Sequence, residues 1–409
     1  MANVSSSNGL EKYPKLRFKG FSEPWTQVLL SDVFKKSTKK NSDGSITNVI
    51  CNSAKNGLIP QREYFDKNIA NSENTDGYYI IEQGDFVYNP RKSIDAPYGP
   101  VSIYKYPESG IVSPLYLCFR ALNTINSSFY DYFFKSPSWH RYIYLSGDSG
   151  ARHDRVSIKD DVFFAMPVNI PSEEEQNRIA SFLTLIEERI AQQQALVERL
   201  KKYKRGAINS FFDKEDVSMK SYFLGEIGTV IRGLSYDKFD VVSDISATVV
   251  LRSNNIQGGF LDYNNDLQFV SKTPSNDQLL QRGDIVICMA NGSASLVGKA
   301  ACFDGNDSRI LTVGAFCGIY RCEKEIIEYF FQSDKYTYAL RKMQQGGDGA
   351  IGNLKPSNIE SLQVSLPNEE LQNNAVKFFK LLDRKIYDAE KILAYLTKLK
   401  SGLLHSLFV

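Results

Sequence analysis

Apolar residues recur in heptads along two long stretches of the chain, residues 172–212 and residues 368–408, and neither stretch contains a proline. The apolar positions of the first stretch are Leu183, Ile186, Ile190, Val197, Leu200, Ala207 and Phe211. Those of the second, each 196 residues later, are Phe379, Leu382, Ile386, Leu393, Leu396, Leu403 and Leu407. Heptads sustained over this length predict two helices that pair in a coiled coil. The alternative is two separate surface helices, each packed on its own domain.

The starts of both helices carry N-terminal signals. Ser172 follows a proline and precedes Glu175 by three residues, which is a capping box, and Asn368 takes the same place in the second copy. A helix of about 40 residues spans about 60 Å. We expect the two helices to run antiparallel, because a parallel pair would bring both globular parts to one end of the rod.

The remainder of the chain also repeats. Residues 83–87 match residues 282–286, and residues 132–136 match residues 329–333. Repeats of solenoid proteins have periods of only about 20 to 50 residues. The duplicated unit is therefore a whole domain followed by a long helix.

The globular parts show short strand-like runs bounded by glycine and aspartate, each followed by a short aromatic helix and a glycine-rich turn. Expected strands are residues 78–81, 86–88, 100–104 and 115–120 in the first copy, and 285–288, 299–303 and 313–321 in the second; the short helices are residues 128–134 and 326–332. The predicted fold is α+β: two repeated mixed α/β domains separated by two long helices that form an antiparallel coiled coil, with pseudo-two-fold symmetry. The predicted boundaries are residues 1–170 and 216–366 for the globular domains and 171–215 and 367–409 for the helical regions.

Composition narrows the class of protein. The chain of 409 residues is 42% hydrophobic, and its net charge of +2 argues against a uniformly basic nucleic-acid binder, although one face can still be basic. The six cysteines form no CxxC pair and the chain has only three histidines, so we expect no metal site. Free thiols fit the cytoplasm. The polar start of the chain does not resemble a signal peptide, and no apolar run is long enough to span a membrane.

One loop differs sharply between the two copies and supplies the candidate DNA contacts. Residues 89–98 contain Arg91, Lys92, Ser93 and Tyr98, whereas residues 289–296 contain Asn291 and Ser293. Arginine and lysine reach guanine edges or phosphates, and asparagine reads adenine. Further candidates are Arg152, His153 and Arg155 after the first glycine-rich turn, Lys355 after the second, and Arg252, Asn254 and Asn255. The alternative for each is an ordinary solvated turn residue.

Motifs for catalysis are absent from the sequence. Residues 292–299 resemble a phosphate-binding loop, but the glycine spacing is wrong and Ala300 replaces the hydroxyl that would bind magnesium. Asn89-Pro90 starts like the adenine-binding motif of amino-methyltransferases, but Arg91 replaces the second proline and the stacking aromatic residue is missing. We therefore assign no catalytic residue and no bound cofactor or metal.

The whole chain resembles the specificity subunits of type I restriction-modification systems. The resemblance rests on residues 16–21 (LRFKGF) with Trp25, on the Pro-x-Glu-Glu-x-Gln start of the first long helix and its near copy at the second, and on the order domain, helix, domain, helix. Two departures are Leu371, which replaces the third acid at the start of the second helix, and Lys19, which stands in place of a proline.

This resemblance implies that the globular domains are target recognition domains, each reading one half of an asymmetric split site in double-stranded DNA. It implies that the coiled coil sets the gap between the half-sites and docks two modification subunits, which bind S-adenosylmethionine and methylate adenine. Restriction subunits that use ATP and magnesium join the complex through them. The rival hypothesis is a duplicated scaffold whose coiled coil binds only proteins.

Overall fold

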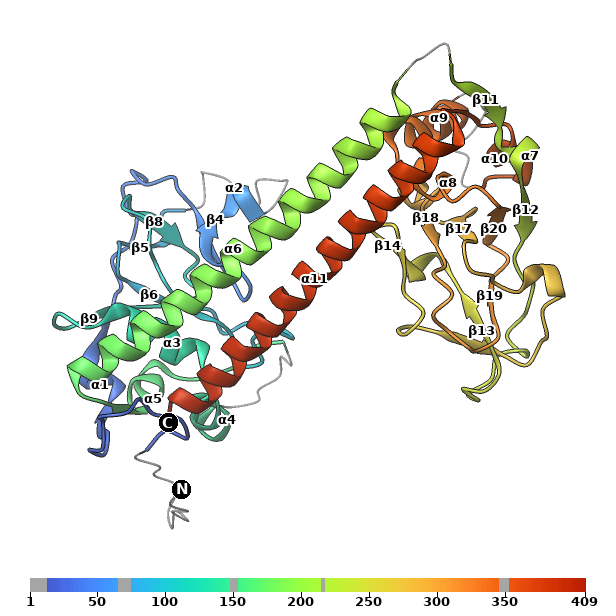
Figure 1. The fold of residues 1–409 in the computed structure, drawn as a ribbon. Helices are drawn as coiled ribbons and strands as arrows, with labels where there is room; N and C mark the ends of the chain where they lie inside the picture. Colours follow the sequence, from blue (N-terminus) through green and yellow to red (C-terminus); the bar gives the residue numbers. More distant parts are fainter. Residues whose placement is uncertain (1–12, 65–74, 148–153, 215–217, 346–352) are drawn as a thin grey trace. The chain divides into compact units, whose positions relative to one another are not determined.

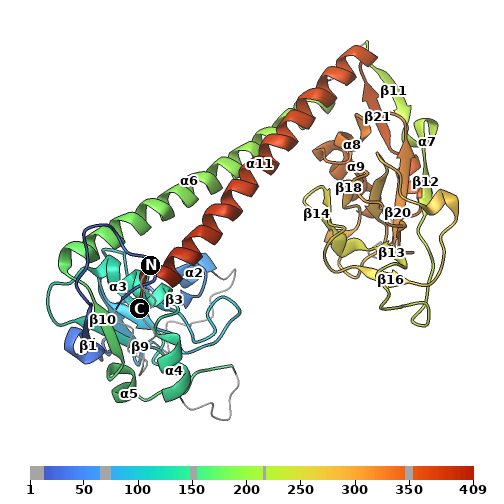
Figure 2. The same cartoon turned by 60° about the horizontal axis from the view of Figure 1, so that its bottom comes forward.

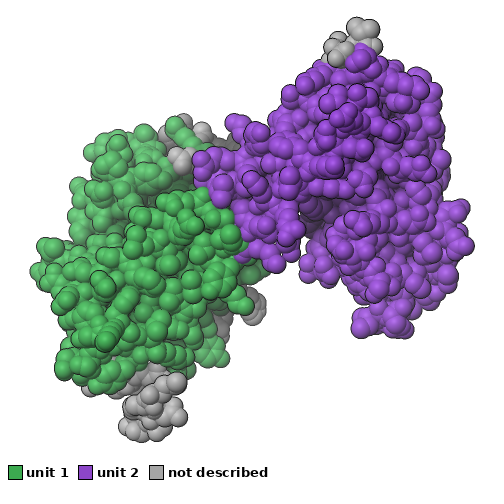
Figure 3. Space-filling model, in the orientation of Figure 1, with its two compact units in different colours: residues 1–193, 392–409 green, residues 194–391 purple. Residues whose placement is uncertain are grey.

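The computed structural model describes residues 13–64, 75–147, 154–214, 218–345 and 353–409 (Figure 1 and Figure 2). The chain forms two compact units, which Figure 3 distinguishes by colour. Unit 1 comprises Met1–Gln193 and Ile392–Val409, and unit 2 comprises Gln194–Lys391. Each unit therefore combines one globular domain with one end of each long helix.

The two long helices are α6 (Glu173–Phe212) and α11 (Glu369–Leu407). Both predicted caps are confirmed, because the Ser172 hydroxyl accepts a hydrogen bond from the Glu175 amide at 3.3 Å and the Asn368 side chain accepts one from the Leu371 amide at 2.9 Å. The last residue of each starting motif has a role of its own. The side chain of Gln176 donates to the carbonyl of Pro171 at 3.0 Å, and Gln372 does the same to Pro367 at 2.6 Å.

The helices run antiparallel within each unit. In unit 2, Lys201 pairs with Glu390 and Lys204 pairs with Asp383. The residue numbers of the partners on α11 therefore decrease as those on α6 increase. In unit 1, Lys400 near the end of α11 pairs with Glu187 near the start of α6. All fourteen predicted heptad positions are buried or half-buried. The predicted antiparallel pair is therefore confirmed in each unit.

Unit 1 is built around a four-stranded sheet in the order β2-β9-β6-β7, to which two two-stranded ladders, β3-β4 and β5-β8, are added, while β1 pairs with β10. The helix α3 lies between this sheet and α6 (Figure 1). Its elements are β1 (Thr26–Leu29), α1 (Leu30–Val33), β2 (Phe34–Lys36), β3 (Ile50–Ser53), β4 (Gly57–Pro60), α2 (Gln61–Tyr64), β5 (Tyr79–Ile81), β6 (Phe86–Tyr88), β7 (Val101–Ile103), β8 (Gly110–Val112), β9 (Leu117–Ala121), α3 (Ser127–Lys135), α4 (His140–Ser146), α5 (Asp160–Phe164) and β10 (Pro167–Ile170).

Unit 2 repeats this plan with a six-stranded sheet in the order β12-β20-β17-β18-β15-β14 and a three-stranded sheet β16-β13-β19, while β11 pairs with β21. Its elements are β11 (Lys220–Phe223), α7 (Leu224–Ile227), β12 (Gly228–Arg232), β13 (Thr248–Leu251), β14 (Ile256–Gln257), β15 (Phe260–Leu261), β16 (Gln268–Val270), β17 (Ile285–Cys288), β18 (Ala300–Cys302), β19 (Leu311–Val313), β20 (Cys317–Cys322), α8 (Ile327–Phe330), α9 (Asp334–Gln345), α10 (Pro356–Glu360) and β21 (Gln363–Leu366), with short 3₁₀ turns at Ser253–Asn255, Asn276–Gln278 and Ala294–Leu296.

The repeated Gly-Asp pair before β6 and β17 is part of the scaffold. Gly84 and Gly283 have φ values of 91° and 92°, which favour glycine. Asp85 is 1% exposed and accepts two hydrogen bonds, of 2.6 and 2.8 Å, from Arg120 on β9. Asp284 is held in the same way by Arg321 on β20. The motif recurs because each sheet uses this pairing of a buried aspartate with a partly exposed arginine.

One predicted strand was wrong. Residues 313–321 read as a single strand, but β19 ends at Val313 and β20 begins at Cys317, in a different sheet. Gly314 turns the chain between them, where its amide donates to the carbonyl of Leu251 and its carbonyl accepts from the Cys317 amide. The other predicted strands and both aromatic helices are present within a few residues of the expected bounds.

The predicted α+β fold with a repeated domain-helix plan is confirmed. The predicted domain boundaries stay a prediction, because the compact units cross them and share out the ends of both helices. In the described residues, no helix is both long and apolar enough to cross a membrane.

Candidate nucleic-acid interface

The loop that follows β6 in unit 1 is held by backbone pairing to a distant segment. Arg91 and Arg155 face each other in an antiparallel bridge. The Lys92 amide donates to the carbonyl of Asp154 at 2.8 Å, and the Val156 amide donates to the carbonyl of Pro90 at 2.9 Å. The structure therefore joins two of the basic clusters that the sequence placed about sixty residues apart.

The side chains of this loop differ in how available they are. Arg91 and Ser93 are exposed and Lys92 is half-buried. Ser93 closes a turn, since its hydroxyl accepts from the Ala96 amide at 3.1 Å. Tyr98 is half-buried against the ring of His140, with the centroids 4.9 Å apart. Arg91 and Lys92 are thus the residues of this loop best placed to meet DNA, and Tyr98 is mainly a packing residue.

Arg155 is half-buried, and its Nε atom is buried without a hydrogen-bond partner among the residues described. Its closest carboxylate is that of Asp154, at 4.0 Å. Arg152 and His153, which were predicted to act with Arg155, lie outside the described residues.

Unit 2 repeats this pairing at the equivalent place. Ala290, after β17, forms an antiparallel bridge with Asn353, and the Leu354 amide donates to the carbonyl of Met289 at 2.6 Å. Lys355, which follows directly, is exposed. Both units therefore present a loop joined to the segment that leads to the last short helix of the domain, α5 or α10.

The polar side chains predicted to read bases on this second loop already form hydrogen bonds within the domain. The amide of Asn291 donates to the hydroxyl of Ser253 at 3.0 Å, and its oxygen accepts from the Ser293 amide at 2.9 Å. Ser293 is exposed, and its hydroxyl lies 2.9 Å from that of Ser295. Reading adenine through Asn291 would require these local hydrogen bonds to exchange.

The third predicted cluster is largely structural. Asn255 is 1% exposed, and its side chain donates to the carbonyls of Asp262 and Asn265 and accepts from the Arg252 amide. A buried and fully bonded amide cannot reach a base edge, so this arrangement argues against Asn255 as a DNA contact. Arg252 and Asn254 both bind the carboxylate of Asp266.

Sequence reasoning missed two exposed apolar side chains at these loops. Ile94, at the tip of the first loop, is fully exposed. Phe316 is 72% exposed, and its backbone carbonyl accepts from the amides of Met289 and Ala290 at the base of the second loop. Apolar side chains contact thymine methyl groups and can wedge between bases. For Ile94 the available signal was an apolar residue between the polar residues Ser93 and Asp95, whereas Phe316 lies between Ala315 and Cys317 and carries no such signal.

A repeated tyrosine, carboxylate and lysine set fixes each domain to the helix pair. In unit 1, the Tyr132 hydroxyl donates to Glu187 at 3.0 Å, and Lys400 binds the same carboxylate at 2.5 Å. Burial alone would raise the pKa of Glu187, but Lys135 and Lys400, with the Tyr132 hydroxyl, lower it to about 2.

In unit 2, Tyr329 donates to Asp383 at 3.1 Å, and Lys204 pairs with that carboxylate. The three positions correspond in the repeat. The candidate loops are therefore carried by domains that these contacts anchor to the helices.

Within the described ranges, no group of three or more histidine, cysteine, aspartate or glutamate side chains is arranged to hold a metal ion. The site consists of exposed cations, hydroxyls and apolar tips on loops carried by rigid sheets. Such an arrangement is suited to contacts with phosphates and base edges.

Comparison with known proteins identifies this type of domain. Residues 22–202 match the family profile described as the type I restriction modification DNA specificity domain. The chain is 34% identical over 148 residues to the type I restriction enzyme EcoKI specificity subunit of Escherichia coli strain K12, covering 34% of this chain and 31% of that protein. It is 34% identical over 152 residues to the StySPI specificity subunit of Salmonella potsdam, covering 35% of this chain and 31% of that one.

The matches thus span about a third of the length of these relatives. They support the resemblance to type I specificity subunits that the sequence motifs indicated, and residues 22–202 are similar to the DNA specificity domain of such proteins.

Two solved structures show the same fold over nearly the whole chain. A chain from a type I R-M system, studied for its complex assembly and conformational transition, aligns with a TM-score of 0.57 and 13% identity, covering 93% of this chain and 96% of that one. The S subunit of a type I restriction-modification system from M. genitalium aligns with a TM-score of 0.55 and 16% identity, covering 97% and 99%. At these identities the likeness establishes the fold.

Proposed function

We propose that the chain is the DNA sequence-specificity subunit of a type I restriction-modification complex. Each globular domain reads one half of an asymmetric, split site in double-stranded DNA. The chain itself is non-catalytic. The match of residues 22–202 to a DNA specificity domain supports the first domain directly, and the repeated architecture extends the role to the second.

The observation that carries the proposal is the repeated loop pairing. The bridges Arg91–Arg155 and Ala290–Asn353 place a loop at the same point of each domain, on the same scaffold. The residues on the two loops are unlike, with cations in unit 1 and an amide and hydroxyls in unit 2. Two readers with one scaffold and unlike loops should recognise two different half-sites.

The partners follow from the same role. Two modification subunits would dock on the helix pair, which would also set the gap between the half-sites. They would bind S-adenosylmethionine and methylate adenines flipped out of the duplex. Restriction subunits would add the ATP- and magnesium-dependent activities. All six cysteines are free thiols, which supports assembly in the cytoplasm.

The rival function is a scaffold that binds only proteins. It predicts that substitutions of the loop side chains change neither DNA binding nor the pattern of methylated sites. The test is Arg91→Ala in the complex reconstituted with its modification subunits, with methylated sites mapped by sequencing. We expect relaxed specificity at one position of one half-site if Arg91 contacts a base, at a cost of about 1–3 kcal/mol. If Arg91 contacts a phosphate, its loss should instead weaken binding to all DNA sequences equally. It should also reduce the slope of the salt dependence of binding by about one.

The matched control is Lys19→Ala, which removes one exposed positive charge from the segment before β1. If Arg91→Ala and Lys19→Ala give the same methylation pattern, the same affinity and the same salt slope as the parent chain, the loop is not an interface with DNA.

A further inference from the structure

The N-terminal segment, residues 13–21, covers one face of the helix pair in unit 1. Arg17 binds the Glu175 carboxylate through two hydrogen bonds of 2.8 and 2.7 Å. The ring of Phe18 packs edge-on against that of Phe182, with the centroids 5.5 Å apart. The Leu16 amide donates to the carbonyl of Ser406 at 2.9 Å. An arginine, an aromatic anchor and a backbone hydrogen bond therefore hold this segment, which contains bends and a turn, on this face.

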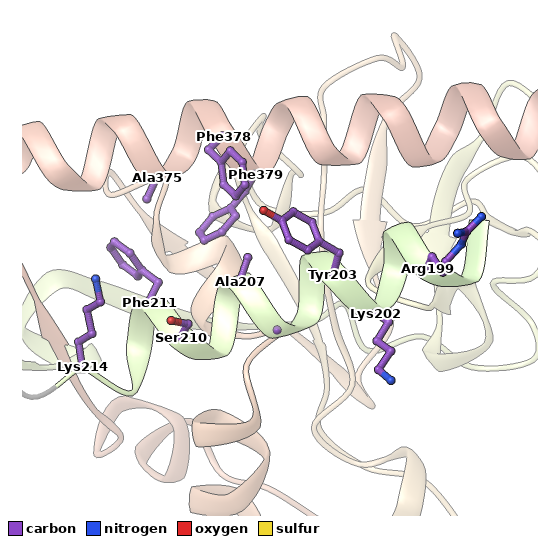
Figure 4. A pocket seen from close by; sticks show the side chains of 11 residues that line it. Arg199, Lys202, Tyr203, Ala207, Ser210, Phe211, Lys214, Ala375, Phe378 and Phe379 are labelled. Atoms are coloured by element: carbon purple, nitrogen blue, oxygen red, sulfur yellow. The ribbon is translucent and has the colours of Figure 1, made fainter. Parts of the chain in front are cut away.

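The repeat places the same face in unit 2, where it is open. The counterparts of Glu175, Phe182 and Ser406 are Leu371, Phe378 and Ser210, each offset by 196 residues. Leu371 is 53% exposed and Phe378 is 41% exposed. A hollow of about 770 Å³ lies here (Figure 4), lined by Arg199, Lys202, Tyr203, Gly206, Ala207, Ser210, Phe211, Lys214, Ala375, Phe378 and Phe379.

Two pairs of rings shape the floor and wall of this hollow. Tyr203 meets Phe378 at 6.4 Å and 78°, and Phe211 meets Phe379 at 6.0 Å and 86°. Figure 4 shows these side chains pointing toward one another from α6 and α11. They give the hollow an aromatic lining, and Phe378 corresponds in the repeat to Phe182, the ring that contacts Phe18 in unit 1.

The charge of the site differs from that of its counterpart, where the Glu175 carboxylate binds Arg17 and the Arg178 guanidinium lies 5.8 Å from the centroid of the Phe18 ring. Arg199, Lys202 and Lys214 line the hollow, and none of its described lining residues carries a carboxylate. The acid that binds Arg17 in unit 1 is replaced by Leu371. An arginine in the occupant would therefore lose its partner and meet three cations.

We propose that this hollow binds an extended segment of another protein, with an apolar aromatic anchor flanked by acidic residues. A second copy of the chain is disfavoured as the source. Its own segment 13–21 carries Lys15, Arg17 and Lys19 and no acid. The two ends of the helix pair then differ, since one is closed by the chain itself and the other is open to a partner. This proposal rests on the docking of partner subunits on the helix pair proposed above, for which it names a site and the chemistry of the occupant, and it does not rest on DNA recognition.

The test uses two fluorescein-labelled peptides and the full chain. The basic peptide is a copy of residues 13–21, and the acidic peptide has glutamate in place of Lys15, Arg17 and Lys19. Fluorescence anisotropy should show the acidic peptide binding about tenfold more tightly than the basic one. Raising the salt concentration from about 50 mM to about 500 mM should weaken binding of the acidic peptide, because screening reduces its attraction to the cations of the hollow.

Phe378→Ala should lower the affinity for the acidic peptide about tenfold or more, as truncation of an aromatic hot-spot residue does. The matched control is Tyr387→Ala, which removes an aromatic ring that is 57% exposed on the same helix outside the hollow. The double variant R199E/K202E should reverse the preference, so that the basic peptide binds more tightly. Circular dichroism checks that each variant is folded.

Three results would overturn the proposal: equal binding of both peptides, equal effects of Phe378→Ala and Tyr387→Ala, or an unchanged preference in the charge-reversed variant. Tighter binding of the basic peptide to the parent chain would instead identify a second copy as the occupant. The assay contains no DNA, so its outcome is separate from that of the methylation test.

Discussion

The carboxylate of Glu187 offers a direct test of how the first recognition domain is anchored. In the folded chain its pKa is lowered from 4.5 to about 2, because Lys135, Lys400 and Tyr132 stabilise the ionised form more than burial opposes it. Each tenfold change in proton affinity corresponds to about 1.4 kcal/mol. The side chain is 30% exposed, so solvent screening reduces the full effect to about 1–2 kcal/mol. We expect Glu187→Gln to destabilise unit 1 by this amount at pH 7.

The lowered pKa of Glu187 fixes the direction in which its contribution to stability changes with pH. A carboxyl whose pKa is lower in the folded state contributes stability that is complete above its unfolded pKa of 4.5 and is lost as the pH falls toward about 2. The difference in stability between the parent chain and Glu187→Gln should therefore fall to less than about half by pH 3. If the variant removed only an uncharged hydrogen bond, this difference would be the same at every pH.

Urea unfolding followed by tryptophan fluorescence reports on unit 1 alone, because the two tryptophans of the chain, Trp25 and Trp139, are both buried there. The matched control is Glu188→Gln, which neutralises the exposed neighbouring carboxylate. The reasoning is refuted if the two variants have the same midpoint at pH 7, or if the destabilisation caused by Glu187→Gln is as large at pH 3.

Three further outcomes are expected. The isolated chain should bind its target weakly, because a net charge of +2 neutralises few phosphates; nanomolar binding in physiological salt, measured by gel shift, would contradict this. Replacing residues 224–362, which lie between β11 and β21, with the equivalent domain of a relative should change one half-site only, and methylation mapping that shows both half-sites altered would count against modular reading. Inserting one heptad into both α6 and α11, at the limits between the units, adds about 10 Å of helix and should lengthen the unread gap by about three base pairs. As a control, the same insertion in α6 alone should break the pairing of the two helices. An unchanged gap in the double insertion, found by mapping methylated sites, would show that the helices do not set the gap.

Local signals in the sequence predicted the helical part of the fold. Ser172 and Asn368 cap their helices as expected, and the heptad residues are buried or half-buried. These features depend on residues a few positions apart. The error at residues 313–321 arose because Gly314 turns the chain into a different sheet, which depends on its hydrogen bond with the distant Leu251.

The candidate site was predicted less completely, because it depends on contacts between distant segments. No local pattern indicates that Arg91 faces Arg155, or that Asn255 is consumed by the carbonyls of Asp262 and Asn265. The anchor between Tyr132 and Glu187 likewise joins residues 55 positions apart. Only the repetition in the second unit would have indicated it, since a tyrosine, an acid and a lysine recur there at the corresponding positions of the repeat.

The backbone pairing of the recognition loops has a consequence for the history of the chain. The bonds that fix these loops, such as those from Lys92 to Asp154 and from Leu354 to Met289, join main-chain atoms. Substitutions at the loop tips can therefore accumulate without disturbing the fold, while the buried aspartates Asp85 and Asp284, each paired with an arginine, resist change. After a duplication, such a molecule diverges where it touches its target and stays constant where it supports itself, so new specificities can arise by drift of a few side chains.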